Sequence, residues 1–93
     1  MSYELTFDKR ALKEWRKLGE TVKAQFKKKL AERLIAPHVM NDKLSGYSAR
    51  YKIKLRTSGY RLVYEVNDNT ITVLVLAIGK REGAEVYKTA EKR

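Results

Sequence analysis

The pattern of apolar residues in the second half of the chain is the feature that most constrains its fold. Apolar side chains alternate with polar ones in residues 51–55 and, apart from Val63, in residues 60–66, whereas residues 71–78 are almost wholly apolar. Alternation is typical of a strand with one buried face, and a continuous apolar run is typical of a central strand that is covered on both faces. Turn-forming sequences, Thr-Ser-Gly at 57–59 and Asn-Asp-Asn at 67–69, separate the three segments. The pattern therefore predicts an antiparallel meander of three strands.

A short strand and two helices are predicted in the first half of the chain. Residues 3–7 alternate between apolar and polar types, and the carboxylate of Asp8 can then cap a helix that we expect to stop at Gly19. The apolar face of this helix comprises Leu12, Trp15 and Leu18. A second helix should end before Pro37, since the residue before a proline disfavours helix. Its apolar stripe, with a spacing of four, comprises Val22, Phe26, Leu30 and Leu34. We expect a helical hairpin, and one long kinked helix is the main alternative.

The remaining segments complete one domain. Residues 38–49 have no clean period and contain several turn-forming residues, which predicts a loop. Gly79 is expected to end the last strand of the meander, and residues 82–92 form a short, weakly helical segment. The contact side of that segment comprises Val86, Tyr87 and Ala90. The order of elements predicts a single α+β domain over residues 1–93, in which the helical hairpin covers one face of the sheet.

The charge balance indicates the kind of partner. The chain carries 21 lysines and arginines against 11 acidic residues, a formal net charge of +10. Because like charges repel in the folded state, such an excess predicts a polyanionic partner. Nucleic acid is favoured over an anionic membrane surface, and a merely soluble basic protein is the alternative. With no cysteine and with His38 as the only histidine, the sequence excludes disulfides, thiolate chemistry and multi-histidine metal centres.

The sequence contains no sign of export or of membrane insertion. Glu4 and Asp8 interrupt the apolar character that a signal peptide needs. The apolar run at residues 73–78 is too short to span a bilayer. We therefore expect a reducing, cytoplasmic location.

A run of cations without acidic residues marks the candidate binding site. The chain has no Asp or Glu from residue 43 to residue 61, and the cations of this stretch are Lys43, Arg50, Lys52, Lys54, Arg56 and Arg61. If the apolar residues face the core, the alternating cations of the first meander strand share the opposite face with Arg61. Lys80 and Arg81 would extend this patch, which suits phosphates, while nearby tyrosines offer stacking surfaces for unpaired bases. The charges at residues 9–33 are interpreted as a solvated surface, because glutamates partly offset them, and His38 as incidental.

Five sequence runs, taken in order, point to one family. They read Arg-Ala-Leu-Lys-Glu-Trp-Arg-Lys-Leu at 10–18, Tyr-Lys-Ile-Lys-Leu-Arg at 51–56, Ser-Gly-Tyr-Arg-Leu-Val-Tyr at 58–64, Gly-Lys-Arg-Glu at 79–82 and Val-Tyr at 86–87. Together they resemble the RelE toxins of toxin–antitoxin pairs over essentially the whole chain. The resemblance implies a microbial-RNase-like fold with a twisted antiparallel sheet, and cleavage of mRNA within a codon in the ribosomal A site.

The resemblance also implies partners. It implies contact with mRNA and ribosomal RNA on the ribosome, and a RelB-like antitoxin that displaces the C-terminal segment carrying Tyr87. DNA would be contacted only indirectly, through the antitoxin complex. Neither a cofactor nor a membrane is implied.

An active site follows from the resemblance position by position. The matching residues are Lys52, Lys54, Arg61, Arg81 and Tyr87. Further RNA-binding candidates are Lys43, Arg50, Arg56 and Lys80. Of these, Arg56 is expected on the same strand face as the matching residues. The chain departs from the family pattern at residues 47–49 and near Ala84, which bears on antitoxin pairing and codon preference more than on chemistry.

The matching residues suit a reaction in which the 2′-hydroxyl of RNA attacks the adjacent phosphate. Lys52 is the candidate base. Its cationic neighbours favour the neutral amine, whereas a bound phosphate favours the charged form. The sequence leaves open which of the two effects is larger. A guanidinium holds its proton strongly, so Arg81 is expected to stabilise the leaving 5′-oxygen, although the family allows it a general-acid role. Lys54 and Arg61 would stabilise the pentacovalent phosphate, and Tyr87 would stack on or orient a base.

Such weak acid–base groups imply that much of the rate comes from positioning, which can be worth roughly 7–11 kcal/mol. A ribosome that holds the codon bent supplies this positioning, so naked RNA is expected to be cut slowly or not at all. One alternative is a non-catalytic RNA-binding module that blocks the ribosome. Another is a DNA-binding partner that acts only with its antitoxin, for which the sequence offers no recognition helix.

Overall fold

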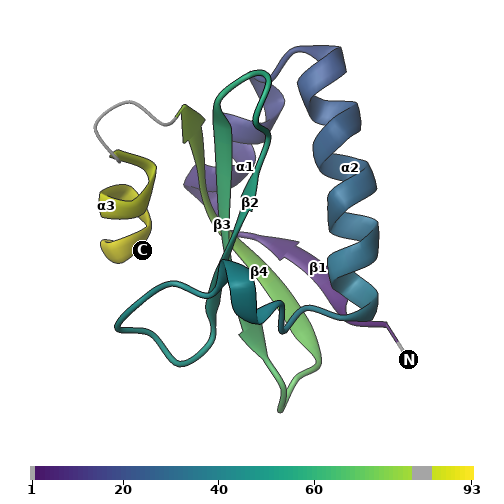
Figure 1. The fold of residues 1–93 in the computed structure, drawn as a ribbon, viewed down its shortest axis with the longest axis vertical. Coiled ribbons are helices and arrows are strands. Elements are labelled where there is room, and N and C mark those ends of the chain that lie inside the picture. The colour runs from purple at the N-terminus through teal and green to yellow at the C-terminus, as the bar shows by residue number, and fades with distance from the viewer. Residues whose placement is uncertain (1, 81–84) are drawn as a thin grey trace.

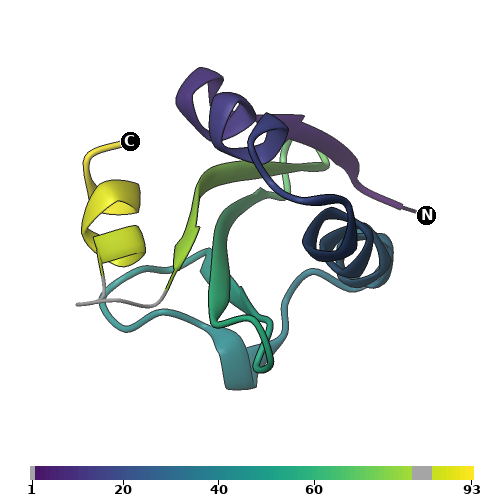
Figure 2. The same ribbon diagram turned by 90° about the horizontal axis from the view of Figure 1, so that it is seen from above.

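The computed structural model describes residues 2–80 and 85–93. Its elements are β1 (Glu4–Phe7), α1 (Lys9–Arg16), α2 (Glu20–Ile35), the 3-10 helix η1 (Met40–Asp42), β2 (Arg50–Lys54), β3 (Tyr60–Asn67), β4 (Thr72–Lys80) and α3 (Glu85–Glu91). The four strands form one sheet (Figure 1), with α1 and α2 packed on one face and α3 on the other (Figure 2). The predicted α+β class is confirmed. In the described part of the chain, no helix has the length and apolar character needed to cross a membrane.

The sheet combines antiparallel with parallel pairing in the order β1-β4-β3-β2. β2 pairs with β3, and β3 with β4, in antiparallel fashion, which confirms the predicted meander. β1 joins the far side of β4 in parallel, with Glu4 opposite Thr72 and Phe7 opposite Val75. Two helices and two strands separate β1 from β4 along the chain, which gives the long connection that a parallel pair needs. β2 is therefore left as one edge of the sheet.

Local capping explains where the first two helices begin and end. The Asp8 carboxylate accepts hydrogen bonds from two backbone N–H groups in the first turn of α1, at 2.9 and 3.4 Å, as expected of an N-cap. α1 ends at Arg16, so the predicted stop at Gly19 is wrong, and Gly19 is instead the N-cap of α2. The break between the helices excludes one long kinked helix. α2 ends at Ile35, before Pro37, as predicted.

The helix side of the sheet holds the larger core. Its buried members are Ala11, Leu18, Phe26, Leu30, Tyr51, Ile53, Leu55, Leu62, Tyr64, Val66, Val73, Val75 and Ile78. On α1 the buried residue is Ala11, so the predicted face was wrong at Leu12. Ala11, Trp15 and Leu18 are spaced by four and three residues, the ordinary spacing along one face of a helix. The ring of Trp15 lies 6.4 Å from that of Phe26, which joins α1 to α2 over this core.

The short helix α3 covers part of the opposite face. Val86 and Ala90, 4% and 1% exposed, pack on apolar residues of β3 and β4, and Tyr87 is half-buried beside them, which confirms the predicted contact side. With a core on each face, β4 is the doubly covered strand that its sequence predicts. The predicted strand end at Gly79 is wrong, because Gly79 pairs with Arg61 within β4. A Cβ at Gly79 would lie 3.7 Å from the Cβ of Val86, so α3 approaches the sheet closely at this residue.

Candidate nucleic-acid interface

Three predicted site residues lie together on the sheet face that α3 partly covers. In the β2–β3 hairpin, Lys54 lies opposite Arg61, which in turn lies opposite Gly79 on β4. Lys52 precedes Lys54 by two residues and lies opposite Val63, so alternation puts it on the same face. Side chains of directly paired residues begin about 4.5–5.5 Å apart at their Cβ atoms. We refer to Lys52, Lys54 and Arg61 as the cationic cluster.

The cationic cluster has no carboxylate partner among the described residues. Within residues 2–80 and 85–93, none of its members forms an ion pair with an acidic side chain. Arg61 is only 8% exposed, and its guanidinium donates a hydrogen bond to the carbonyl of Tyr60 at 3.4 Å. Lys54 is exposed at the end of β2. Because a guanidinium stays protonated, this face carries positive charge that no acidic side chain of residues 2–80 and 85–93 pairs with, and a bound anion would compensate it.

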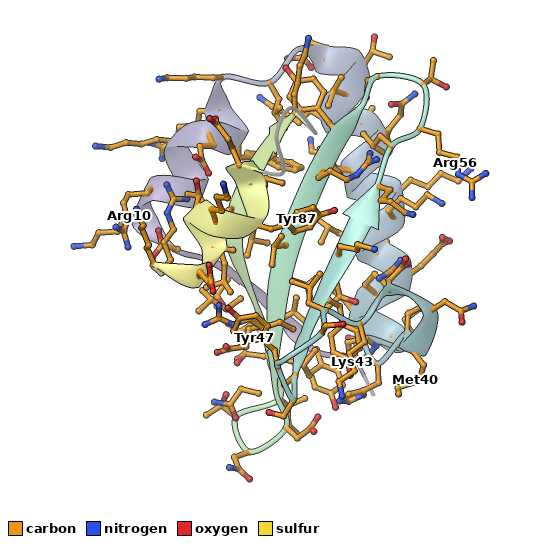
Figure 3. All side chains as sticks on the ribbon, turned by 60° about the vertical axis from the view of Figure 1, so that its left-hand side comes forward. Arg10, Met40, Lys43, Tyr47, Arg56 and Tyr87 are labelled. Atoms are coloured by element: carbon orange, nitrogen blue, oxygen red, sulfur yellow. The ribbon has the colours of Figure 1, made fainter. Side chains whose placement is uncertain are left out.

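Tyr87 reaches over the same face from α3. Figure 3 shows its side chain extending from the helix across the sheet toward β2 and β3. The ring is half-buried against the apolar residues under α3, which fixes its position and leaves part of it accessible. An aromatic ring held in this way beside cations can stack on an unpaired base while the cations bind phosphate.

Arg50, predicted as an RNA-binding residue, is engaged within the protein. Its Nε donates to the Glu65 carboxylate at 2.9 Å, and its Nη1 donates to the carbonyl of Ala90 in α3 at 3.1 Å. The guanidinium also lies 4.6 Å from the ring centre of Tyr47. Arg50 therefore helps to hold α3 on the sheet, and its charge already has a partner.

Three further predicted RNA-binding residues do not share the sheet face of the cationic cluster. Arg56 is not on the expected strand face, because β2 ends at Lys54 and Arg56 belongs to the following turn, from which it projects outward (Figure 3). Lys80 follows Gly79 and so points to the other face, where its Nζ lies 5.6 Å from the ring centre of Tyr60. Lys43 is exposed and forms an isolated antiparallel β-bridge with Tyr51 of β2. Arg81 lies outside the described residues.

Arg33 of α2 forms several hydrogen bonds within the protein, although its stretch of sequence was predicted to be a solvated surface. Its side chain is 12% exposed and donates to the Asp42 carboxylate at 2.6 Å, to the Tyr64 hydroxyl at 2.9 Å and to the carbonyl of Lys52 at 3.2 Å. It therefore ties α2 and η1 to the outer edge of β2, directly behind the cationic cluster. Its position three residues after Leu30, on the buried side of α2, is a signal that the sequence offered.

The protonation of this network follows from its surroundings. Burial alone lowers the pKa of Arg33, but the contacts with Tyr64 and Asp42 outweigh it, so the net shift is upward and the guanidinium stays charged. Burial raises the pKa of the Tyr64 phenol, against the opposing effect of Arg33. Tyr64 is thus neutral and donates to the carbonyl of Pro37 at 2.7 Å while it accepts from Arg33.

A second network holds the C-terminal end of the chain. β1 pairs with β4 only as far as Val75, which leaves backbone groups of β4 open beyond that point. Glu14 of α1 accepts from the backbone N–H of Ile78 at 3.1 Å, and Arg93 donates to the carbonyl of Leu76 at 2.9 Å. Arg93 and Glu14 are themselves paired at 2.8 Å. No local pattern predicts this pair, because its partners are far apart along the chain.

The fold and the interface together define a class of protein. This is a small basic α+β domain in which one face of the meander carries cations without an ion-pair partner in the described part of the chain, and α3 places a half-exposed tyrosine beside them. Phosphates and unpaired bases are the ligand groups that this combination suits.

Comparison with known proteins identifies the family within that class. The sequence model of the family described as the ParE toxin of the type II toxin-antitoxin system, parDE, matches residues 5–84. The mRNA interferase toxin RelE of Escherichia coli (strain K12) is 59% identical over 93 residues, which cover 100% of this chain and 98% of that protein. The mRNA interferase RelE of Shigella flexneri is 59% identical over the same shares.

Solved structures agree with the sequence comparison. A mutant of E. coli RelE in the free state superposes with a TM-score of 0.92 at 58% identity, covering 100% of this chain and 98% of that one. A chain of the intact E. coli RelBE toxin–antitoxin complex matches with a TM-score of 0.85 at 58% identity, over 87% and 99% of the two chains. The chain therefore belongs to the RelE family of type II toxins, which confirms the resemblance found in its sequence.

Proposed function

We propose that this protein is the toxin of a RelBE-type pair and an endoribonuclease that cleaves mRNA in the A site of the ribosome. The observation that carries the proposal is the cationic cluster, which lacks an ion-pair partner in the described chain and lies beside Tyr87 on one sheet face. The mRNA interferase names of its E. coli and Shigella relatives support the assignment. Such an enzyme works in the cytoplasm, where messages are translated.

The proposed reaction is a transesterification within the RNA. The 2′-oxygen attacks the neighbouring phosphorus while Lys52, the proposed base, takes its proton. The bond from phosphorus to the 5′-oxygen breaks, and the 5′-oxygen takes a proton from solvent water. The products are a 2′,3′-cyclic phosphate and a 5′-hydroxyl. Lys54 and Arg61, paired across the hairpin, stabilise the charge of the pentacovalent phosphate. Arg81 stabilises the leaving oxygen, and Tyr87 stacks on or orients a base.

The ribosome has a defined part in this mechanism. Lysine and arginine are weak acid–base catalysts near neutral pH, so the site contributes mainly charge that is already in place. The remaining barrier is lowered by holding the 2′-oxygen in line with the breaking bond, which can supply roughly 7–11 kcal/mol. A codon fixed in the A site of a ribosome has this restricted geometry, whereas free RNA does not.

We infer that a RelB-like antitoxin inhibits the enzyme by displacing α3. E. coli RelE forms an intact complex with RelB, and a mutant of it binds a RelB peptide. In this chain α3 is held by the burial of Val86 and Ala90 and by contacts from Arg50 and Arg93, which the antitoxin would have to replace. Displacement would also move Tyr87 from the sheet face. DNA is contacted through the antitoxin in this scheme.

The chemistry of the new RNA ends tests the function. Ribosomes programmed with a defined message are incubated with the intact protein, and the 3′ ends of the fragments are analysed. We expect 2′,3′-cyclic phosphates next to 5′-hydroxyl ends. A stalled message without new ends would instead show the non-catalytic ribosome-blocking module, and 3′-hydroxyl ends would show a hydrolysis that does not involve the 2′-oxygen.

A further inference from the structure

A second cationic surface lies at the β2 edge of the sheet. A groove of about 480 Å³ runs between α2 and the turn that joins β2 to β3. Its cations are Lys28 and Lys29 of α2 together with Lys54 and Arg56 at the end of β2 and in the turn. Folding alone brings these residues together, because the two pairs are far apart in the sequence. The helical lysines belong to the stretch that the sequence analysis interpreted as a merely solvated surface.

The cations of this groove outnumber its carboxylates. Glu32 is the carboxylate of its lining. Over the described residues, none of the four groove cations forms an ion pair with an acidic side chain. Several arginines elsewhere are paired with carboxylates, namely Arg10, Arg33, Arg50 and Arg93. Four neighbouring cations thus face one another beside a single carboxylate of the described lining, and an anion that binds in the groove relieves their mutual repulsion.

The groove is continuous with the cationic cluster through Lys54. This lysine lies opposite Arg61 in the β2–β3 hairpin and also lines the groove. Because β2 is the edge strand, the surface passes from the sheet face around this edge to α2 without a covering element between them. A chain of phosphates that is bound at Lys54 can therefore continue into the groove.

The lining of the groove fits a nucleic-acid backbone better than a protein segment. Leu55 is its apolar member, and at 7% exposure this side chain already belongs to the core. Protein partners usually bury an apolar centre, which this groove does not offer. The exposed apolar side chains Ile35 and Met40 lie at the other end of α2 and in η1, and Figure 3 shows Met40 well apart from Arg56. Phosphates, by contrast, need only the cations.

We propose that this groove binds RNA backbone phosphates next to the cleavage site and guides the strand around the sheet edge. The inference rests on the proposed function for the identity of the ligand, which is RNA on the ribosome. Binding in the groove increases the affinity for RNA and fixes the position of the strand relative to the cleavage site, whereas the reaction itself takes place at the cationic cluster. The message and ribosomal RNA have the same phosphate backbone, and the experiment below distinguishes which of the two the groove binds.

The test compares two double variants of α2 that remove the same charge. Lys28→Gln with Lys29→Gln neutralises the helical side of the groove, and Lys23→Gln with Lys27→Gln changes lysines of the same helix that do not line it. Cleavage is measured against ribosome concentration, and binding is measured over a salt series. For the groove variant we expect KM for ribosomes to rise about tenfold with little change in kcat. The slope of the logarithm of the binding constant against the logarithm of the salt concentration should become shallower by about 1.5, since each lost phosphate contact removes about 0.7–0.9. The matched variant should stay within about twofold of the intact protein.

Binding to vacant and to message-programmed ribosomes identifies the RNA. If the groove variant binds both vacant and programmed ribosomes more weakly than the intact protein, the groove contacts ribosomal RNA. If it binds only programmed ribosomes more weakly, the groove contacts the message. The proposal is overturned if the two double variants behave alike, if kcat falls while KM stays constant, or if antitoxin affinity drops while RNA affinity does not. If the intact protein binds ribosomes without cutting, the proposed function fails, while the binding measurements still decide the role of the groove.

Discussion

Replacing Arg61 by methionine is expected to lower kcat for message cleavage on the ribosome by about 10²–10³-fold, the usual effect of removing one fixed charge-stabilising group. Arg61 is 8% exposed and lies opposite Lys54, so its guanidinium is held in place before the phosphate arrives. Methionine keeps the apolar length of the side chain and removes only its charge and donors. Single-turnover cleavage on programmed ribosomes measures the effect, and thermal unfolding checks that the variant is folded.

Lys13→Met is the matched control for this prediction. Lys13 is an exposed cation of α1, and its removal changes the net charge by the same amount. Cleavage by this variant should remain within about twofold of the intact protein. A folded Arg61→Met variant that cleaves as fast as the Lys13→Met control would show that the cationic cluster is not the site.

Replacing Arg33 by methionine should lower the free energy of unfolding by about 3 kcal/mol, because it leaves partly buried groups without their partner. Asp42 would lose an ion pair of 2.6 Å, and the carbonyl of Lys52 and the hydroxyl of Tyr64 would each lose a donor. Since domains of this size are stable by only about 5–15 kcal/mol, the melting temperature should fall by more than about 10 °C. Urea and thermal unfolding followed by circular dichroism measure both quantities.

A double variant separates the lost partner from the lost packing. Adding Asp42→Leu to Arg33→Met removes the unpaired carboxylate, and an apolar pair often replaces a buried ion pair at little cost. The double variant should therefore regain part of the free energy of unfolding that Arg33→Met loses. The double-mutant cycle then gives a coupling free energy between the two substitutions. A loss below about 1 kcal/mol for Arg33→Met alone would mean that the network contributes no more than a surface ion pair.

The parts of the fold that depend on neighbouring residues could be predicted from the sequence. Alternation defined β2 and β3, and the turn at residues 57–59 determined that Lys54 and Arg61 meet on one face. The apolar run predicted that β4 is covered on both faces, and Asp8 caps α1 as its side chain suggests. These features need only the period of two in a strand and the hydrogen bonds of a first helical turn.

The errors arose where tertiary contacts decide the outcome. Pairing with β3 carries β4 past Gly79, which turns Lys80 to the other face, and the hairpin turn removes Arg56 from the strand. The ion pair of Arg33 with Asp42 depends on η1 folding back against α2, which no local pattern encodes. Likewise, the cations of α2 gain a shared groove only when the β2–β3 turn packs beside them.

Primer extension on one message, with the intact protein, in the presence and absence of translating ribosomes, tests the central claim most directly. The cationic cluster provides charge and the ribosome provides geometry, so we expect cuts within codons on the ribosome and little or no cutting of the free RNA. Rapid cutting of the free RNA at the same positions would contradict this account, because the protein would then position the reacting groups by itself.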